Sequence, residues 1–453
     1  MSDSIEHQKA LTQTEKDIQR WGAVLGNPTP GSRLLDIPIL PGRIKQREED
    51  FLVDEIPLYE PSGTGEHVYV RLQKHGMSHS ELLAIVRKHF KVRESAIGAA
   101  GMKDRMAVTS QTLSIHMPDR EPTQKPIDDD RLEILWMSRH ANKLRRGHLE
   151  GNRFVIRIRD LEPIQAPQLW RGMKELEKRG IPNYYGHQRF GYRRNTQRLG
   201  GYLLKNNAQD IIDDVLGTQG SWFPAHQREQ RELYQDGKIK KAMQLWGRRD
   251  EAEKAIIAKL VSKQTPDVAV KAVSRHMRGF WVSAVQSAIF NHVLDARVRD
   301  GSSDQILEGD VAFRHQSRKG FLVDKGTLGA EDQQARVKDF EISPAGPIWG
   351  EGMLNAGGEI AEQELAFLRE ANIDEEMFTK VALGIKGTRR PYRVQMTNTG
   401  IDSGFDDHGP YIRITMDLPR GSYATVVLRE LLGDEGVDSA RRDQRDAGVY
   451  DSH

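Results

Sequence analysis

The sequence contains no cysteine. This absence excludes disulfide bonds, thiolate catalysis and zinc sites built from cysteine. It fits a reducing cytoplasm, and residues 1–6 lack the charged and then apolar pattern of a secretion signal. No apolar run approaches the roughly 20 residues of a membrane span. We therefore expect a cytoplasmic protein that does not enter a membrane.

The chain also lacks a glycine-rich phosphate loop of the Walker type and a spaced set of metal ligands. Its histidines, such as His116, His140 and His148, are scattered along the chain. The sequence also lacks internal repeats of the solenoid type. We accordingly predict that the protein uses no cofactor and no metal.

Charge of one sign is not in excess, because the net charge is only +2 over 453 residues. A protein that binds nucleic acid with so little net charge must gather its positive charge locally. Two segments rich in arginine do this, residues 131–160 and residues 186–200. Such clusters are often ordinary solvated surface, but two separate clusters favour contact with RNA.

Length and composition set the size of the fold. The chain is long enough for two or three domains, and 37% hydrophobic with 29% charged residues is typical of a protein that builds cores. Strand patterns occur near both ends, at residues 50–55, 67–72 and 411–417, whereas residues 200–275 favour helices. The sequence therefore predicts an α+β fold with a more helical middle.

Several local patterns predict individual elements. Residues 67–72 alternate as in a half-buried strand, and Ser78 with Glu81 forms a capping box ahead of a helix. A short helix is expected near residues 15–25. A further helix should follow residue 425 and end at Gly433, leaving a polar, disordered tail.

One acid lies between two cations at Lys103, Asp104 and Arg105. Small residues precede this tripeptide, and an alternating segment typical of a strand follows it. Asp104 is thus predicted on a tight turn entering a sheet, with neighbouring cations that keep its carboxylate ionised. An ionised aspartate of this kind can be a nucleophile, a general base or a metal ligand. Taken alone, the tripeptide favours a solvated loop acid with two exposed bases.

Four longer strings resemble motifs of the TruD family of tRNA pseudouridine synthases. They are residues 101–111, residues 183–191, residues 283–291 and residues 418–425. The resemblance implies a pseudouridine-synthase catalytic domain with a mixed, largely antiparallel sheet, formed by residues 40–179 and 387–433. It also implies an inserted α/β TRUD domain at residues 180–386. A polar extension, 1–39, and a polar tail, 434–453, would flank them.

The resemblance further implies isomerisation of uridine to pseudouridine in tRNA, usually at position 13, with Asp104 as the nucleophile. It requires no cofactor or metal, and we expect a monomer whose partner is tRNA. Tyr423 stands where many members have phenylalanine, which keeps a ring for stacking. The other residues that match, as substrate-binding or supporting residues, are Phe51, Asn152, Lys103, Phe154, Glu55 and Arg189.

Two other classes of protein would use the same residues differently. A metal-dependent nuclease or phosphotransferase could combine Asp104 with Asp54 or Glu55, and chelators would abolish its activity. A non-catalytic RNA-binding protein or chaperone would bind tRNA equally well after removal of Asp104.

Overall fold

The computed structural model describes residues 12–247, 250–330 and 332–446. The chain forms two compact units, divided after Ser32, Asn183 and Arg393. We call the unit that contains residues 33–183 and the chain from 394 onward the sheet unit. The other, with residues up to 32 and residues 184–393, is the helical unit.

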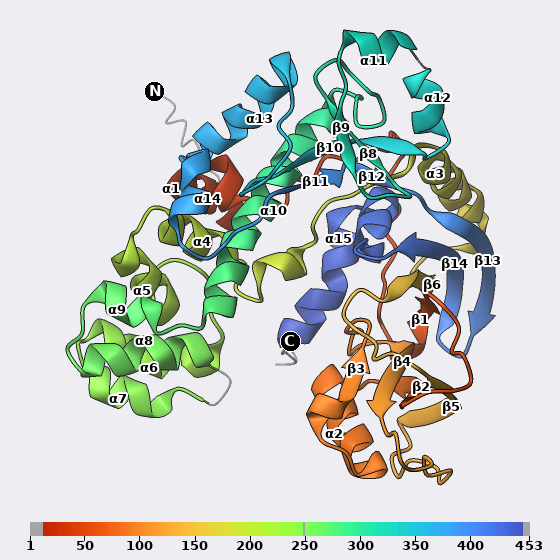
Figure 1. Cartoon of the computed structure of the whole chain (residues 1–453), viewed down its shortest axis with the longest axis horizontal. Coiled ribbons are helices and arrows are strands. Elements are labelled where there is room, and N and C mark those ends of the chain that lie inside the picture. The colour runs from red at the N-terminus through yellow and green to blue at the C-terminus, as the bar shows by residue number, and fades with distance from the viewer. Residues whose placement is uncertain (1–11, 248–249, 331, 447–453) are drawn as a thin grey trace, which may run out of the picture. The chain divides into compact units, whose positions relative to one another are not determined.

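The sheet unit is organised around a mixed β-sheet with strand order β13-β14-β6-β1-β4-β2-β5, in which β3 also pairs with β4 (Figure 1). Strands β1 and β4 run parallel, and the other neighbouring strands run antiparallel. The sheet is mixed and largely antiparallel, as the sequence predicted. Its strands are β1 (Phe51–Pro57), β2 (His67–His75), β3 (Ile97–Ala99), β4 (Val108–His116), β5 (Leu132–His140), β6 (Leu149–Arg159), β13 (Thr397–Asp406) and β14 (Gly409–Pro419).

Helices of the sheet unit pack against this sheet and against each other. The capping box is confirmed, since Ser78 caps α2 (His79–Phe90) and the Glu81 side chain accepts from the Ser78 backbone N–H at 2.9 Å. Leu82, Val86 and Phe90 then pack on the apolar side chains of β2 and β4. The remaining elements are the 3-10 helices η1 (Glu48–Asp50), η2 (Glu94–Ala96) and η3 (Pro163–Gln165), helices α3 (Ala166–Arg179) and α15 (Ala424–Asp446), and β7 (Ile181–Pro182).

Strand β2 differs from the half-buried strand that its alternation predicted. Val68, Val70 and Leu72 are buried, but so are Tyr69 and Arg71 on the opposite face. The polar face of β2 is covered because Arg71 donates to the carboxylate of Asp54 and, at 2.8 Å, to the carbonyl of Glu55. An alternating pattern assigns residues to the two faces of a strand, but it does not establish that the polar face is exposed to solvent.

Helix α15 does not end at Gly433, and this corrects the prediction of a disordered tail for residues 434–446. The backbone kinks at Gly433, where φ is +70°, and the helix then continues to Asp446. Asp434 lies at the start of the second segment, where an acidic residue favours a helix. Residues 447–453 of the predicted tail lie outside the described residues.

The helical unit is built around its long helix α10 (Arg275–Arg299), which is buried along most of its length. A smaller sheet has the order β11-β10-β8-β9 (Figure 1). His292 on α10 lies at the core boundary, as expected, with Nε2 2.7 Å from the carbonyl of Asn27. The strands are β8 (Val311–Arg314), β9 (Gly320–Leu322), β10 (Ile342–Ile348) and β11 (Thr388–Pro391), and β12 (Arg393–Val394) spans the division between the units.

The other helices of this unit confirm the predicted helical middle. The expected short helix near residues 15–25 is α1 (Gln13–Gly26), capped by Thr12. The rest are η4 (His187–Phe190), α4 (Thr196–Leu204), α5 (Ala208–Leu216), η5 (Ala225–Gln227), α6 (Arg228–Gln235), α7 (Ile239–Leu245), α8 (Glu251–Val261), α9 (Pro266–Lys271), α11 (Lys325–Ala330), α12 (Gln333–Lys338), α13 (Gly358–Glu370) and α14 (Glu375–Lys380).

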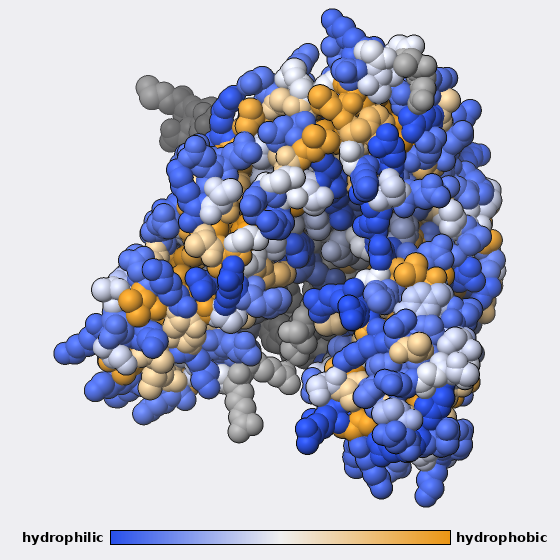
Figure 2. Space-filling model, viewed as in Figure 1, coloured by the Kyte–Doolittle hydropathy of each residue, from blue (hydrophilic) through white to orange (hydrophobic). Residues whose placement is uncertain are grey.

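Most of the visible surface is hydrophilic (Figure 2). Exposed apolar side chains include Leu307, Leu322 and Leu354, which belong to the helical unit near β8, β9 and β10. Among the helices of the described residues, none is both long enough and apolar enough to cross a membrane.

Candidate active site

Asp104 lies in the loop between β3 and β4, as the sequence predicted, and its side chain is 30% exposed. Oδ2 of Asp104 accepts a hydrogen bond from Lys45 Nζ at 2.5 Å. The fully buried Lys74 on β2 donates to the backbone carbonyls of Asp104 at 2.8 Å and Met77 at 2.6 Å. Two lysines therefore hold this loop, one through the carboxylate and one through the backbone.

Lys45 contacts the Asp104 carboxylate, whereas the neighbouring Lys103 pairs elsewhere, which corrects the sequence prediction for Lys103. Lys103 crosses to β1 and β6, where its Nζ donates to Asn152 Oδ1 at 2.5 Å and lies 3.2 Å from Glu55 Oε2. Burial lowers the pKa of Lys103, while the Glu55 carboxylate opposes that shift. Neighbours in the sequence thus serve two different ion pairs.

Phe51 and Phe154 form the apolar side of the site. Their ring centres are 6.2 Å apart in an edge-to-face arrangement, and both rings are buried. The ammonium of Lys45 lies 4.2 Å from the centre of the Phe51 ring, within the range of a cation–π contact. Phe51 therefore supports Lys45 beneath Asp104, and its 2% exposure leaves little free ring surface.

Lys45 has a backbone φ of +56°, a conformation that residues other than glycine seldom adopt. Such strain persists only where the surrounding contacts determine it. Here these contacts are the Asp104 carboxylate and the Phe51 ring. Neither Lys45 nor Lys74 is marked in the sequence, because an isolated lysine carries no signal of its distant partner.

Tyr423 lies in the turn between β14 and α15 and is half-buried. Backbone bonds link the surrounding loops: Gly147 N–H donates to Ala100 O at 2.7 Å, and Arg420 N–H donates to Glu150 O at 3.0 Å. The side chain of Arg420 also donates to the Gly147 carbonyl. The Tyr423 turn is thus connected through residues 147–150 to the segment that leads into the Asp104 loop.

Arg189, the remaining predicted substrate-binding residue, belongs to the helical unit. Its Nε donates to Ser287 Oγ at 3.0 Å, and its guanidinium lies 5.5 Å from the Tyr185 ring centre and 5.3 Å from that of Phe280. Arginine beside aromatic rings is a combination that proteins use to stack on bases.

Most arginines of the first cluster that lie on β6 are paired with acids. On β6, Arg153 pairs with Asp417, and Arg159 pairs with Asp50 and Asp406. These acids neutralise the row of arginines that the sequence left open as an RNA-binding face.

In the second cluster, Arg193 is 7% exposed and donates to the carbonyls of Trp222 at 3.1 Å and Asp214 at 2.9 Å. Arg198 is also buried, beside Asp214 and Trp21. The prediction that this cluster is a basic RNA surface is therefore wrong for these two residues. By contrast, Arg145 and Arg146 are exposed.

Asp54 and Glu55 do not join Asp104 in a metal site. They alternate along β1, and each has its own cation, Arg71 for Asp54 and Lys103 for Glu55. Among the described residues, no group of three or more histidine, aspartate or glutamate side chains could hold a metal ion. Asp54 and Glu55, which the nuclease-like alternative would need beside Asp104, are thus paired with Arg71 and Lys103.

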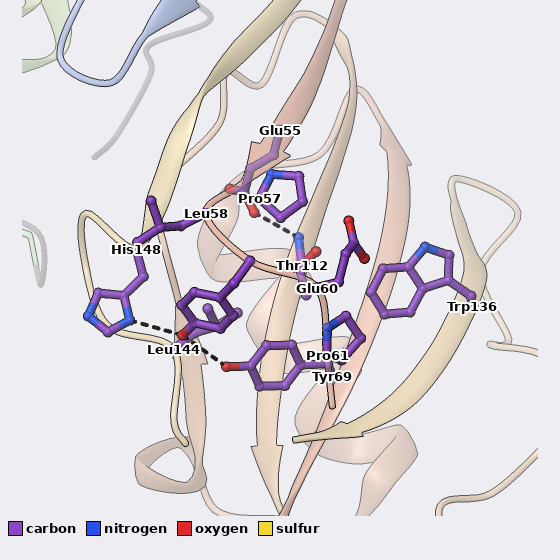
Figure 3. Close-up of a pocket in the computed structure, with 11 residues that line it drawn as sticks. Glu55, Pro57, Leu58, Glu60, Pro61, Tyr69, Thr112, Trp136, Leu144 and His148 are labelled. Atoms are coloured by element: carbon purple, nitrogen blue, oxygen red, sulfur yellow. Dashed lines mark hydrogen bonds between the residues drawn. The ribbon is translucent and has the colours of Figure 1, made fainter. Parts of the chain in front are cut away.

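Glu55 also reaches a small pocket lined by Tyr69, Thr112, Trp136 and His148 (Figure 3). There Glu55 Oε1 accepts from the Thr112 backbone N–H at 3.1 Å. Tyr69 donates its hydroxyl to the Asn142 carbonyl at 2.9 Å, and burial raises its pKa. Glu55 therefore contacts Thr112 through one carboxylate oxygen and Lys103 through the other, and Lys103 in turn donates to Asn152.

Comparisons with known proteins agree on one family. A family model described as tRNA pseudouridine synthase D (TruD) matches residues 33–431. A tRNA pseudouridine synthase D from Geobacter sp. (strain M21) is 36% identical over 401 residues, which make up 88% of this chain and 98% of that protein. One from Geotalea daltonii is 34% identical over 400 residues, with the same shares. A solved structure from Methanosarcina mazei, also described as tRNA pseudouridine synthase D (TruD), matches with a TM-score of 0.76 and 25% identity over 90% of this chain and 97% of that one.

Proposed function

Because this chain belongs to the TruD family of tRNA pseudouridine synthases, we propose that it isomerises uridine to pseudouridine in tRNA with Asp104 as the nucleophile. The observation that carries the role of Asp104 is its partly exposed carboxylate, held at 2.5 Å by Lys45. An aspartate that is oriented by a lysine and open to solvent on one side can approach a bound nucleotide.

The reaction conserves atoms, and this explains why no redox group is needed. The bond between the ribose and N1 of uracil breaks, the freed base turns, and C5 bonds to the sugar while its proton is lost and N1 gains one. Asp104 would attack the ribose or the base through its carboxylate. The target base must first leave its stack, at a cost of a few kcal/mol.

Other predicted site residues would have separate roles. We assign stacking on the target base to Tyr423, since base–aromatic stacking contributes about 1–3 kcal/mol. Lys103 and Asn152 would position the nucleotide next to Asp104, while the buried Phe51 and Phe154 support the site. Arg189 would contact RNA from the helical unit.

The finer parts of the proposal come from the family resemblance. The target would be the position-13 uridine, and the enzyme would act as a cytoplasmic monomer. Residues 40–179 and 387–433 would form the catalytic domain, and residues 180–386 the inserted TRUD domain.

The test is to incubate the purified protein with an unmodified tRNA transcript and to map pseudouridine by position. Asp104→Asn should abolish formation of pseudouridine and leave tRNA binding within a few-fold, because the amide is nearly isosteric but far less nucleophilic. The matched control is Asp128→Asn, which changes an exposed loop acid of the same unit. Formation of pseudouridine by a homogeneous Asp104→Asn preparation would rule out Asp104 as the nucleophile.

The same assay separates the two alternatives. Loss of activity in EDTA, restored by a divalent ion while the tRNA stays folded, would favour a metal-dependent nuclease. Binding of tRNA without any modified nucleotide, in wild type and Asp104→Asn alike, would favour an RNA-binding protein.

A further inference from the structure

An open groove of about 540 Å³ lies at the end of β2 that is remote from Asp104. It is lined by His67 at the start of β2, by His116 at the end of β4, by Arg93 and Ala96 around η2, and by Lys143 after β5. Lys74, which bonds to Asp104, stands at the other end of β2. At about 3.4 Å per residue, the two ends are about 24 Å apart.

His67 is the unusual member of the groove. The strand register places it opposite His116, with ring centres 5.0 Å apart. His67 is 8% exposed, yet its Nδ1 has no hydrogen-bond partner among the described residues. Burying a polar atom without a partner costs free energy, which makes this side chain an exception in the core.

Lys143 is held in the groove by local structure. Its Nζ donates to the Ser95 carbonyl at 2.6 Å, and the Leu144 backbone N–H donates to Ser114 Oγ at 2.9 Å. Gly98 permits this close packing, because a Cβ there would lie 2.3 Å from the Leu144 carbonyl oxygen. The cation is therefore fixed at the wall of the groove and does not sweep through solvent.

Most of the titratable groups near His67 disfavour its charged form. Burial lowers the pKa of His67, and the neighbouring His116, Lys143 and His140 act in the same direction, while Glu66 opposes them. Glu66 lies 3.5 Å from His116 Nε2 and is exposed. A neutral His67 still donates one N–H, and Arg93 adds an exposed guanidinium.

We propose that this groove binds a backbone phosphate of the RNA substrate, at a point remote from the reacting uridine. The inference rests on the proposed function, since it takes tRNA as the ligand. A phosphodiester fits because it is an anion with several acceptor oxygens, and His67, Arg93 and Lys143 supply donors to the groove. Val92 and Ala96 add an apolar part of the wall that a ribose can contact.

This contact acts on binding and not on chemistry. The groove does not touch the nucleotide at Asp104, so losing it should raise KM and leave kcat unchanged. Each phosphate contact also releases a counterion, which makes affinity dependent on salt. The salt dependence of tRNA binding is therefore the specific readout.

The experiment measures the Kd of unmodified tRNA against salt concentration for full-length wild type, Arg93→Gln, Lys143→Gln and the double variant. The matched control is Lys178→Gln, an exposed lysine on α3 of the same unit. We expect the double variant to lower the log–log slope by about 0.7–0.9 for the lost phosphate, and the control to leave it unchanged. Its kcat at saturating tRNA should match that of wild type.

An unchanged slope in the double variant would overturn the proposal, and so would an equal fall in the Lys178→Gln control. Arg93 is exposed, so Arg93→Gln tests the groove even if a change at Lys143 disturbs packing. If wild type itself neither binds tRNA nor forms pseudouridine, the proposed function has failed, which is a distinguishable result.

Discussion

Lys45 contacts the candidate nucleophile, although no motif or pattern in the sequence indicates this contact. It joins the Asp104 carboxylate to the Phe51 ring and adopts a strained backbone conformation to do so. We therefore propose that Lys45 positions the Asp104 carboxylate.

We predict that Lys45→Gln lowers kcat about ten- to a hundred-fold, where each tenfold corresponds to about 1.4 kcal/mol of the barrier. The reason is that the Asp104 carboxylate would lose its orienting cation. Lys45→Arg should retain more activity, and KM should change little in both variants. Steady-state kinetics on a tRNA transcript test this, with Lys125→Gln, an exposed loop lysine, as the control. Wild-type kcat in Lys45→Gln would contradict the role.

Tyr423 should work through its ring and not through its hydroxyl. Tyr423→Phe is expected to keep near-normal turnover, because the family resemblance permits phenylalanine here. Tyr423→Ala should lose about 1–3 kcal/mol of transition-state binding, the range for one stacked base. Turnover and thermal melts of both variants give the answer. A core role would be indicated instead if Tyr423→Ala melted far below wild type, or if Tyr423→Phe were equally inactive.

At the scale of elements, the sheet depends on pairing between strands that are far apart in the sequence. Strand β14 pairs with β6, and Asp417 lies directly opposite Arg153. Arg153 donates two hydrogen bonds of 2.8 Å to this carboxylate, and Asn398 donates a third at 2.7 Å. Burial would raise the pKa of Asp417, but these bonds outweigh it and hold the pKa below its usual value.

We predict that Asp417→Asn lowers the free energy of unfolding at neutral pH by about 1–2 kcal/mol. This is the lower part of the range for hydrogen bonds to charged groups, since Arg153 is half exposed. A carboxyl with a depressed folded pKa stabilises the fold above its unfolded pKa of about 3.9, and that contribution is lost as the pH falls through the folded pKa. The difference between variant and wild type should therefore shrink below about pH 3.9.

Denaturant titrations across this pH range measure the effect. The matched control is Arg413→Gln, which breaks the exposed cross-strand pair of Arg413 with Asp402 and should cost at most about 1 kcal/mol. A pH-independent difference for Asp417→Asn would show that packing, and not the charge, is responsible.

For the whole molecule, the small net charge makes the location of each cation decisive. Arg145 and Arg146 are exposed, whereas Arg193 is buried and bonded to two backbone carbonyls of its own unit. We therefore expect substitutions of these arginines to differ in their effect on tRNA binding, although the sequence does not distinguish them.

We predict that Arg145→Gln or Arg146→Gln reduces the salt slope of tRNA binding by about 0.7–0.9 for each phosphate contact that is lost. Arg193→Gln should leave the slope unchanged and lower the melting temperature, because it leaves buried carbonyls without a donor. Filter binding at several salt concentrations and a thermal melt test both statements. A reduced slope in Arg193→Gln with an unchanged melt would reverse the assignment.

Much of this protein is determined by local sequence. The capping box at Ser78 and the alternation of β4 and β14 each depend on residues a few positions apart, whose geometry is set by short-range sterics and hydrogen bonds. The loop position of Asp104 follows in the same way, from small residues before it and a strand after it. The motifs around these elements were enough to indicate the family.

Only the tertiary structure decided what covers each polar side chain. The partner of Asp104 is 59 residues away in the sequence, and that of Arg153 is 264 residues away. Alternation assigns a residue to a face, but an ion pair depends on which distant strand or loop is brought over that face. For this reason the sequence indicated Asp104 as the candidate nucleophile, while the lysine beside it, the acids that neutralise β6 and the burial of Arg193 required the fold.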